Sequence, residues 1–535
     1  MQITATVIVL SPTDLPSNAM KPTLRVSLHI PSLAILVAIA LAARWRIADL
    51  DFHSALSTYL ADDAFYYFKV AANLFASHRI TYDGDSLTNG FHPLWLMLIT
   101  PLYTTANHGE DFVSRVQWLS FLLQLGSVGM LYVTMLRLGA GWWIAFSGTA
   151  MFGLHSSFID FQFNGLETSL NTLALLGLFN AFLTVYQEPT VPVRRYLFFG
   201  VMAASAFLAR TDNAIALLVL FISLASVTLP RWQLHKVIAS GLLALLLVSP
   251  WLIWNQINFG SVVQTSGKLE TAFDGEPHFS WMGLLGKLIF SPVIIYGQTA
   301  ELARMYVFPG FQDLLAIAIL LVWFFSVSVL LVSKRSPPAL HAVALFSVGV
   351  FLVFCYHAGI RNFVRSWYFV SAAMAIMLAV YGLVIFAEKN PNVLTRRAAQ
   401  LSMGLWLVSV IGLHWPGKLA GIVTGEAPHQ AVATWLETHT EPDAVIGSMN
   451  SGILSYLTPR KVINLDGVMD LRSLQARWHK QEPTYVHERG INYLVDNEGS
   501  LRFFCAENPY HSCETVFTFG DPNRPNQVVK LIPHH

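Results

Sequence analysis

The stretch YLADDAFYYFKVAANLF (residues 59–75) places two adjacent carboxylates, Asp62 and Asp63, in a chain that is otherwise strongly apolar. Of the 535 residues, 54% are hydrophobic and 12% are charged, and the mean hydropathy is +0.50. An average soluble domain carries roughly 25% charged residues. The composition therefore indicates an integral membrane protein. The net charge of +1 gives no polyelectrolyte character, so no nucleic-acid partner is expected.

Apolar windows on both sides of this stretch predict a polytopic α-helical protein in a lipid bilayer. A helix needs about 20 apolar residues to cross the bilayer. Two shorter apolar runs, 93–103 and 284–297, are expected to be interfacial or re-entrant, so the total is about 11 to 13 spans. The expected spans lie near residues 30–48, 113–136, 141–158, 167–187, 196–210, 213–229, 236–254, 311–333, 338–356, 367–387 and 398–415.

Basic residues predict the side of the membrane on which each loop lies, because short cytoplasmic loops are enriched in Lys and Arg. With the N-terminus inside, the outer face receives the first outer loop (49–112), a second large loop (255–310) and the C-terminal tail. Counting residues 93–103 as a full span would put the basic SKRSPP segment (333–338) on the outer face, so we do not count this run as a span. The inner face then holds Lys21, Arg25, Arg137, Arg194, Arg195, Arg231, Lys236, Lys334, Arg335, Lys389, Arg396 and Arg397.

The two ends of the chain differ from the membrane domain at 29–415. Residues 1–28 are expected to be a cytoplasmic segment. A signal peptide is the alternative for the first apolar run, and it leaves the later sidedness unchanged. From residue 416 the composition is that of a soluble domain. Helix and strand patterns at 429–440, 444–448, 451–457, 461–467, 491–496 and 527–532 predict a small α/β unit over residues 416–535.

Two local features of this C-terminal unit carry predictions. Cys505 and Cys513 flank a short polar loop, and we expect them to form a disulfide because the tail is assigned outside, whereas Cys355 lies in an apolar run. The turn SMNSG (448–452) between a strand and a helix is suited to an anion. Structural or acceptor-binding use of that turn is favoured over nucleotide binding.

The first outer loop begins with the carboxylate pair. Phe65, Phe68 and Phe75 recur at helical spacing and predict an amphipathic helix along the membrane surface. Asp62 and Asp63 would then start this helix, where its dipole favours negative charge. An N-cap role for Asp62 is the simpler alternative and is compatible with a chemical role.

These features resemble the GT-C superfamily of polyprenyl-phosphate-sugar-dependent glycosyltransferases, which includes protein O-mannosyltransferases, aminoarabinose transferases and mycobacterial arabinofuranosyltransferases. The resemblance covers most of the chain. One departure is the segment LARTDNA (208–214), where members of the family often have an Arg-Pro-Glu-Gly-like turn. The resemblance rests on the carboxylate pair, the helix after it, and the segments TNGFHPLW (88–95), FNGLETSL (163–170), LARTDNA (208–214), NFGSVVQTSGKLE (258–270), RNFVRSWYF (361–369) and SMNSGILSYLTPRKVINLDG (448–467).

The resemblance implies that residues 29–415 form a catalytic domain whose active site faces outward from a bacterial cytoplasmic membrane. The donor would be a polyprenyl-phosphate sugar, and the acceptor an envelope glycan, lipid or protein. A carboxylate takes the proton of the acceptor hydroxyl in a single inverting displacement. We expect Asp62 to be this base and Asp63 to orient the site. The leaving phosphate is already a stabilised anion, so the site needs cations rather than a second acid.

Several residues of the outer loops are candidates for binding substrate. The cations are Arg210, Lys268, Arg361 and Arg365, each of which has ordinary snorkelling as its alternative. Trp367 and Tyr368 would line the groove or only belong to an aromatic belt. The remaining candidates are Asn89, His92, Glu167 and Asp212; His92 and Glu167 have helix-start alternatives, and Asp212 has an ion pair with Arg210 as its alternative.

Other functions remain open from the sequence. The DGD pattern (83–85) matches the carboxylates that hard cations prefer, but such residues more often form turns, so we expect no metal cofactor. A transporter or flippase is the rival class. Transporters place ionisable residues within spans near the midplane, whereas here they gather in outer loops. A third possibility, a non-catalytic subunit of an envelope complex, does not explain the aspartate pair.

Overall fold

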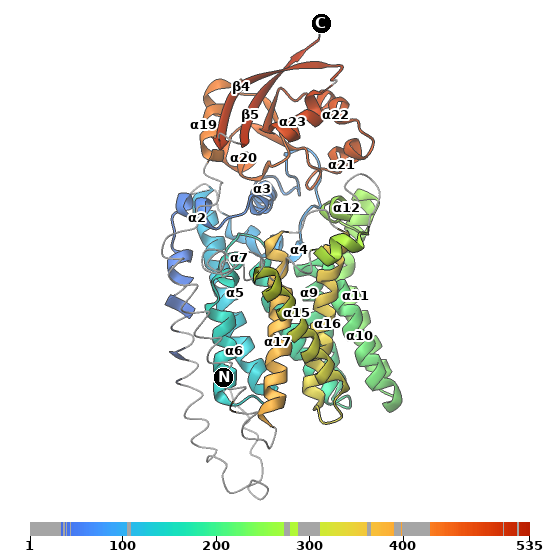
Figure 1. Cartoon of the computed structure of the whole chain (residues 1–535). Coiled ribbons are helices and arrows are strands. Elements are labelled where there is room, and N and C mark those ends of the chain that lie inside the picture. The colour runs from blue at the N-terminus through green and yellow to red at the C-terminus, as the bar shows by residue number, and fades with distance from the viewer. Residues whose placement is uncertain are drawn as a thin grey trace, which may run out of the picture.

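The computed structural model describes residues 44–103, 109–271, 279–286, 311–360, 365–389, 428–506, 508–521 and 524–534, together with residue 397 and single positions between 31 and 42. The predicted span at 398–415, the N-terminal segment 1–28 and Arg361 lie outside the described residues. A bundle of helices carries a small domain with a β-sheet at one end (Figure 1).

Among the residues that the structure describes, six helical segments are long and apolar enough to cross a membrane: Glu110–Arg137, Thr168–Gln187, Thr211–Arg231, Leu234–Phe259, Pro338–Ile360 and Val370–Glu388. They coincide with six predicted spans. The predicted spans at 141–158 and 196–210 are shorter helices. The helices of the bundle are α5 (Glu110–Arg137), α6 (Trp142–Leu154), α7 (Ser156–Gln162), α8 (Thr168–Gln187), α9 (Val193–Ala209), α10 (Ala214–Thr228), α11 (Leu234–Phe259), α15 (Phe311–Val332), α16 (Pro338–Ile360) and α17 (Phe369–Glu388).

Small residues allow several of these helices to approach one another closely. A Cβ atom added at Gly200 in α9 would lie 2.4 Å from the carbonyl oxygen of Ser240 in α11. At Gly349 in α16, it would lie 3.2 Å from the Cα atom of Ala216 in α10. In a bilayer, where lipid is as apolar as a side chain, such close backbone packing is a main source of helix association.

The first outer loop forms α2 (Phe52–Thr58), α3 (Asp62–Ser77), α4 (Pro93–Ile99) and the 3-10 turn η1 (Thr100–Leu102). Helix α3 lies between the bundle and the C-terminal domain (Figure 1). Phe65 and Phe68 are fully buried, and both rings pack against Tyr456 of the C-terminal domain. The position of this helix along the membrane surface stays a prediction, but these two apolar side chains are buried inside the protein. The apolar residues of this helix make the contact between the two parts of the protein.

The C-terminal domain confirms the predicted α/β unit. Its sheet has the order β2-β1-β3-β5-β4. Strands β2, β1 and β3 are parallel to one another, whereas β5 is antiparallel to both of its neighbours, β3 and β4. The predicted disulfide between Cys505 and Cys513 is also confirmed. The elements are α19 (Pro428–His439), β1 (Val445–Ser448), α20 (Gly452–Leu457), β2 (Lys461–Asn464), α21 (Leu471–Trp478), α22 (Glu482–Glu488), β3 (Tyr493–Asn497), α23 (Glu498–Cys505), β4 (His511–Asp521) and β5 (Arg524–Pro533).

Candidate active site

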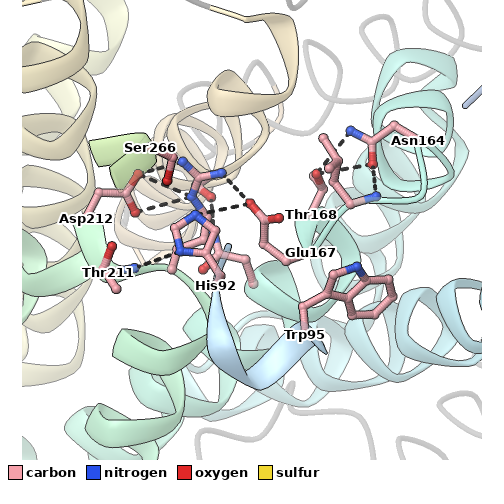
Figure 2. Close-up of polar contacts among 12 residues, drawn as sticks. His92, Trp95, Asn164, Glu167, Thr168, Thr211, Asp212 and Ser266 are labelled. Atoms are coloured by element: carbon pink, nitrogen blue, oxygen red, sulfur yellow. Dashed lines mark hydrogen bonds and ion pairs between the residues drawn. The ribbon is translucent and has the colours of Figure 1, made fainter. Parts of the chain in front are cut away.

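Four ionisable side chains from three parts of the bundle meet in a buried cluster, which we call the Arg210 cluster: Glu167, Arg210, Asp212 and His357. The guanidinium of Arg210 lies 2.6 Å from Glu167 Oε1 and 2.6 Å from Asp212 Oδ2. His357 Nε2 in α16 lies 2.7 Å from the same Asp212 oxygen. Glu167 and Asp212 point toward each other (Figure 2). The two carboxylates balance Arg210, and His357 adds a polar partner to Asp212.

Tyr368 closes one side of the Arg210 cluster. It lies in the 3-10 turn η4 (Ser366–Tyr368), and its ring centroid is 4.5 Å from the guanidinium carbon of Arg210. The same ring stacks on His357 at 5.0 Å. Contact with an aromatic face stabilises a guanidinium further where water is excluded. The predicted binding residue Tyr368 therefore supports Arg210 rather than standing alone in an aromatic belt.

Tyr67 joins this cluster to helix α3. Its hydroxyl donates to Glu167 Oε2 at 3.0 Å and accepts from the backbone N–H of His92 at 3.0 Å. Burial raises the pKa of Tyr67, so the phenol stays protonated and able to donate. The His92 ring lies between Glu167 Oε1, at 3.6 Å, and the backbone N–H of Thr211, at 3.4 Å (Figure 2).

The loop before α8 has a backbone shape that holds Glu167 against α3. Gly165 has a positive φ of 81°, and a Cβ atom there would lie 2.7 Å from the Cβ atom of Ala64. Only glycine fits this position without strain. Trp95 Nε1 donates to the Gly165 carbonyl at 3.1 Å, and Asn164 Oδ1 accepts from the backbone N–H of Leu166 at 3.0 Å.

The adjacent carboxylates have different surroundings. Both lie in the first turn of α3, as predicted, but its N-cap is Ala61, so the N-cap alternative for Asp62 is wrong. Asp62 instead accepts from the backbone N–H groups of Gly452 at 3.2 Å and Ile453 at 2.7 Å. These groups form the start of α20 in the C-terminal domain. The anion that the predicted SMNSG turn receives is therefore the side chain of Asp62.

Asp63 lies on the other side of the helix start. Successive residues of a helix point about 100° apart, while residues i and i+4 share a face. Asp63 thus shares a face with Tyr67, whose hydroxyl contacts Glu167. The residue is partly exposed. Of the two predicted catalytic residues, Asp63 is therefore the one that shares a helix face with Tyr67, which contacts the Arg210 cluster.

The predicted binding residue Asn89 is fully buried and holds the outer loops together. Its Oδ1 atom accepts from the backbone N–H of Thr265 at 3.0 Å and from its hydroxyl at 2.5 Å. Its Nδ2 atom donates to Asn255 at 3.1 Å. These contacts fix the start of α12 (Thr265–Thr271), the helix that carries Lys268.

The remaining predicted cations differ in burial. Arg210 is only 6% exposed, so it does not snorkel to water. Lys268 is half-buried, and burial lowers the pKa of its ammonium group. Arg365 is also half-buried, with its guanidinium 5.8 Å from the ring centroid of Trp367. Lys268 and Arg365 are thus the described cations of the predicted set that remain accessible to a substrate.

The carboxylates of the DGD pattern contact the C-terminal domain. Asp83 pairs with Arg489, and Asp85 pairs with Lys461. Within the described part of the chain, no three His, Cys, Asp or Glu side chains are grouped so that they could hold a metal ion. In this structure both aspartates serve the contact between the domains.

Sequence reasoning missed two members of this site. His357 stands near the C-terminal end of the largely apolar helix α16, and an ionisable residue inside a span is a signal for function. Tyr67 lies one helical turn after Asp63, which places it on the same face of the predicted helix. Both signals were present in the sequence, but they do not show that His357 contacts Asp212 or that Tyr67 contacts Glu167.

Comparisons with known proteins agree with this architecture. Residues 420–529 match the family model of a domain of unknown function (DUF8728). A comparison with curated protein sequences gives no match. Among solved structures, ArnT from Cupriavidus metallidurans in the apo state is similar with 14% identity and a TM-score of 0.56, covering 94% of this chain and 98% of that chain.

Two further solved structures have the same arrangement. The archaeal oligosaccharyltransferase AglB from Archaeoglobus fulgidus, in complex with an inhibitory peptide and a dolichol-phosphate, has 12% identity and a TM-score of 0.54, covering 88% of this chain and 69% of that chain. The arabinofuranosyltransferase AftD from Mycobacteria has 14% identity and a TM-score of 0.50, with 94% of this chain and 40% of that chain covered. The chain is therefore an integral membrane protein with a GT-C-like fold.

Proposed function

We propose that this protein is a glycosyltransferase that moves a sugar from a polyprenyl-phosphate donor to an acceptor of the cell envelope. The observation that carries the proposal is the position of Asp62 and Asp63 at the start of α3, between the bundle and the C-terminal domain of a GT-C-like fold. The names of the structural neighbours AglB and AftD describe sugar transfer, and the AglB complex contains a dolichol-phosphate. This supports a lipid-linked donor.

We place the reaction on the outer face of a bacterial cytoplasmic membrane. Basic residues gather in the loops at the end of the bundle opposite the C-terminal domain, as the positive-inside rule requires of a cytoplasmic side. The disulfide between Cys505 and Cys513 supports an oxidising compartment for the C-terminal domain. Both observations favour the same orientation.

We assign the general base to Asp63 in place of Asp62. The carboxylate of Asp62 is engaged by two backbone N–H groups of α20. Asp63 shares a helix face with Tyr67 and is therefore directed to the side of the Arg210 cluster. A base must reach the acceptor hydroxyl, and geometry comes before basicity in choosing it.

The reaction is a single displacement. The acceptor oxygen forms a bond to the anomeric carbon while its proton passes to Asp63, and the bond from that carbon to the phosphate oxygen breaks. Both electrons of the broken bond leave with the polyprenyl phosphate, and the configuration at the anomeric carbon is inverted. Deprotonation by a positioned base typically contributes roughly 100-fold to 10,000-fold in rate.

The phosphate of the donor requires positive charge. Arg210 is balanced by Glu167 and Asp212, so we assign it to holding these carboxylates in place for the sugar hydroxyls. Lys268 and Arg365 are half-buried and are the better candidates for the phosphate. A bound anion would also offset the lowered pKa of Lys268.

The decisive experiment incubates the purified protein in detergent with a panel of polyprenyl-phosphate sugars and measures the release of polyprenyl phosphate. Asp63→Asn should lower turnover about 100-fold or more, because it removes the base but keeps the size of the side chain. Asp62→Asn is the matched control, since it removes an equal charge at the adjacent position. It should retain more turnover.

Two results would contradict this assignment. Full turnover in Asp63→Asn with loss in Asp62→Asn would return the base to Asp62. Full turnover in both variants, or no consumption of any donor by the wild-type protein, would reject glycosyl transfer at this loop.

A further inference from the structure

A cavity lies at the end of the bundle away from the C-terminal domain. Helix α5 starts beside Tyr456 of that domain, whose hydroxyl donates to the Gly109 carbonyl at 2.8 Å, and it ends 28 residues later at Arg137. There α5, α8 and α9 enclose a cavity of about 330 Å³. It is lined by Arg137, Asn180, Ala181, Thr184, Arg195 and Phe198.

Arg137 is held in a fixed position at this cavity. Its Nη1 atom donates to the backbone carbonyl of Asn180 at 2.9 Å and to Oδ1 of the same residue at 2.7 Å. Its Nη2 atom donates to the hydroxyl of Thr184 at 2.6 Å. A residue that only snorkels to water needs no such contacts. The guanidinium is therefore pre-positioned by α8.

Arg195 adds a second positive charge on the same cavity. Its backbone N–H donates to the Pro192 carbonyl at 2.9 Å, but its guanidinium makes no hydrogen bond or ion pair within the described part of the chain, and no carboxylate is paired with Arg137 there either. Arg195 lies in the first turn of α9, which has neither an acidic residue in that turn nor a side-chain cap. The positive end of a helix dipole disfavours a cation. An anion between the two guanidinium groups would give them a partner of opposite charge and would interact favourably with the helix dipole.

The rest of the lining is suited to a lipid. Phe198 is 53% exposed, one helical turn from Arg195 on α9, and Ala181 offers a further small apolar surface. The residues thus place a cationic end beside an apolar wall. Basic pockets between transmembrane helices on the cytoplasmic side are suited to phospholipid head groups.

We propose that Arg137 and Arg195 form a binding site for the phosphate of an anionic phospholipid, with an acyl chain along Phe198. This site is separate from the Arg210 cluster, because it lies at the opposite end of the bundle. In the orientation proposed above it takes its lipid from the cytoplasmic leaflet.

The test compares Arg195→Gln with Arg194→Gln in the full-length protein. Arg194 is the adjacent exposed cation in the same helical turn, and it does not line the cavity. Both variants have the same net charge, so general attraction to anionic lipid is matched. Each purified protein is delipidated and titrated with phosphatidylglycerol, phosphatidylcholine or inorganic phosphate. Bound molecules are counted by native mass spectrometry and stability is followed as Tm.

We expect phosphatidylglycerol to bind to the wild-type protein and to Arg194→Gln, and to raise Tm in both. In Arg195→Gln its affinity should fall roughly tenfold, as expected for loss of one charge-assisted contact. Without lipid, Tm should be the same in Arg194→Gln and Arg195→Gln, because each removes one cation from the first turn of α9 and the Arg195 guanidinium has no partner in the described structure. Arg195→Lys should bind with intermediate affinity, since it keeps the charge but not the planar fork.

Other outcomes would overturn the proposal. Equal binding of phosphatidylglycerol by Arg195→Gln and Arg194→Gln would remove the site. An equal rise of Tm with inorganic phosphate would assign the cavity to a free anion instead of a lipid. If phosphatidylcholine bound as tightly as phosphatidylglycerol, the apolar surface of Phe198 and Ala181 would bind lipid without any contribution from the two arginines.

Discussion

Arg210 is the residue on which the buried charges of the bundle depend. Its guanidinium lies 2.6 Å from an oxygen of each of two carboxylates, Glu167 and Asp212, that are themselves almost fully enclosed. Burying an ion costs several kcal/mol unless a partner compensates it. Arg210 lies between the two carboxylates and gives each of them a partner of opposite charge.

Arg210→Met should therefore destabilise the protein by about 3 to 5 kcal/mol, the range typical for a broken buried ion pair. Thermal unfolding in detergent would measure the loss. The triple variant Arg210→Met, Glu167→Gln, Asp212→Asn should recover much of it, because no buried charge is left uncompensated. A single variant as stable as the wild-type protein would show that the carboxylates are not held as ions.

The individual site residues were only partly predictable. Glu167, Arg210, Asp212 and Tyr368 were all predicted as binding residues, and the structure brings them together. The contact between His357 and Asp212 could not be predicted, because the two residues are 145 positions apart in the chain. The engagement of Asp62 by α20 depends in the same way on docking between distant segments.

Helix packing in the bundle depends on positions without a side chain. Gly200 in α9 faces the carbonyl of Ser240 in α11, with no room for a methyl group. Backbones that approach this closely gain contacts along the whole pair of helices. The approach of α9 and α11 also positions the C-terminal end of α9, where Arg210 follows directly.

Gly200→Ala should destabilise the bundle by about 1 to 3 kcal/mol, as overpacking does in well-packed cores. Gly129→Ala in α5 is the control, since a Cβ atom there meets nothing within 4 Å. The control should be neutral or slightly stabilising because alanine favours a helix. Equal Tm values for the two variants would mean that α9 and α11 are not in contact at this position.

At the level of elements, strong patterns were predicted well and short ones were not. Six long apolar windows predicted the six described helices that could cross a membrane, and strands β1, β2, β3 and β5 were expected from their apolar runs. Helices α21, α22 and α23 are at most eight residues long and carry mixed sequences. Strand β4 has mostly exposed residues, so its sequence has few buried apolar positions to mark it.

The whole molecule is held together by a polar interface between α3, the loop after it and the C-terminal domain. Tyr82 donates to the carbonyl of Ser451 at 2.8 Å, and Asp83 pairs with Arg489. A Cβ atom at Gly90 would lie 2.0 Å from the carbonyl of Val468, so the two surfaces fit closely. Asp466 belongs to this interface and lies near Asp62.

Docking of the two parts should depend on pH through Asp466. Burial, with a smaller contribution from the negative charge of Asp62, raises its pKa to about 7, while the charge of Arg477 acts in the opposite direction. Because the folded pKa lies above the unfolded one, stability falls as pH rises from about 4 to about 7 and is level above that.

The measurement compares Tm of Asp466→Asn with that of the wild-type protein from pH 5 to pH 8.5. Asparagine resembles the protonated carboxyl, so the variant should gain stability relative to the wild-type protein as pH rises toward 7. Effects of other titrating groups cancel in the comparison. A difference in Tm that is constant over this range would show that Asp466 titrates as an exposed carboxylate.

The contact between Asp62 and Gly452 also constrains how this chain can change over evolutionary time. A side chain at 452 would meet the backbone oxygen of Asp62 at 2.1 Å, so only glycine fits position 452 while the segment 390 residues before it is docked there. A recombination event that exchanged the C-terminal domain with that of a relative would have to preserve both partners. Inheritance of the domain is thus tied to inheritance of the first outer loop.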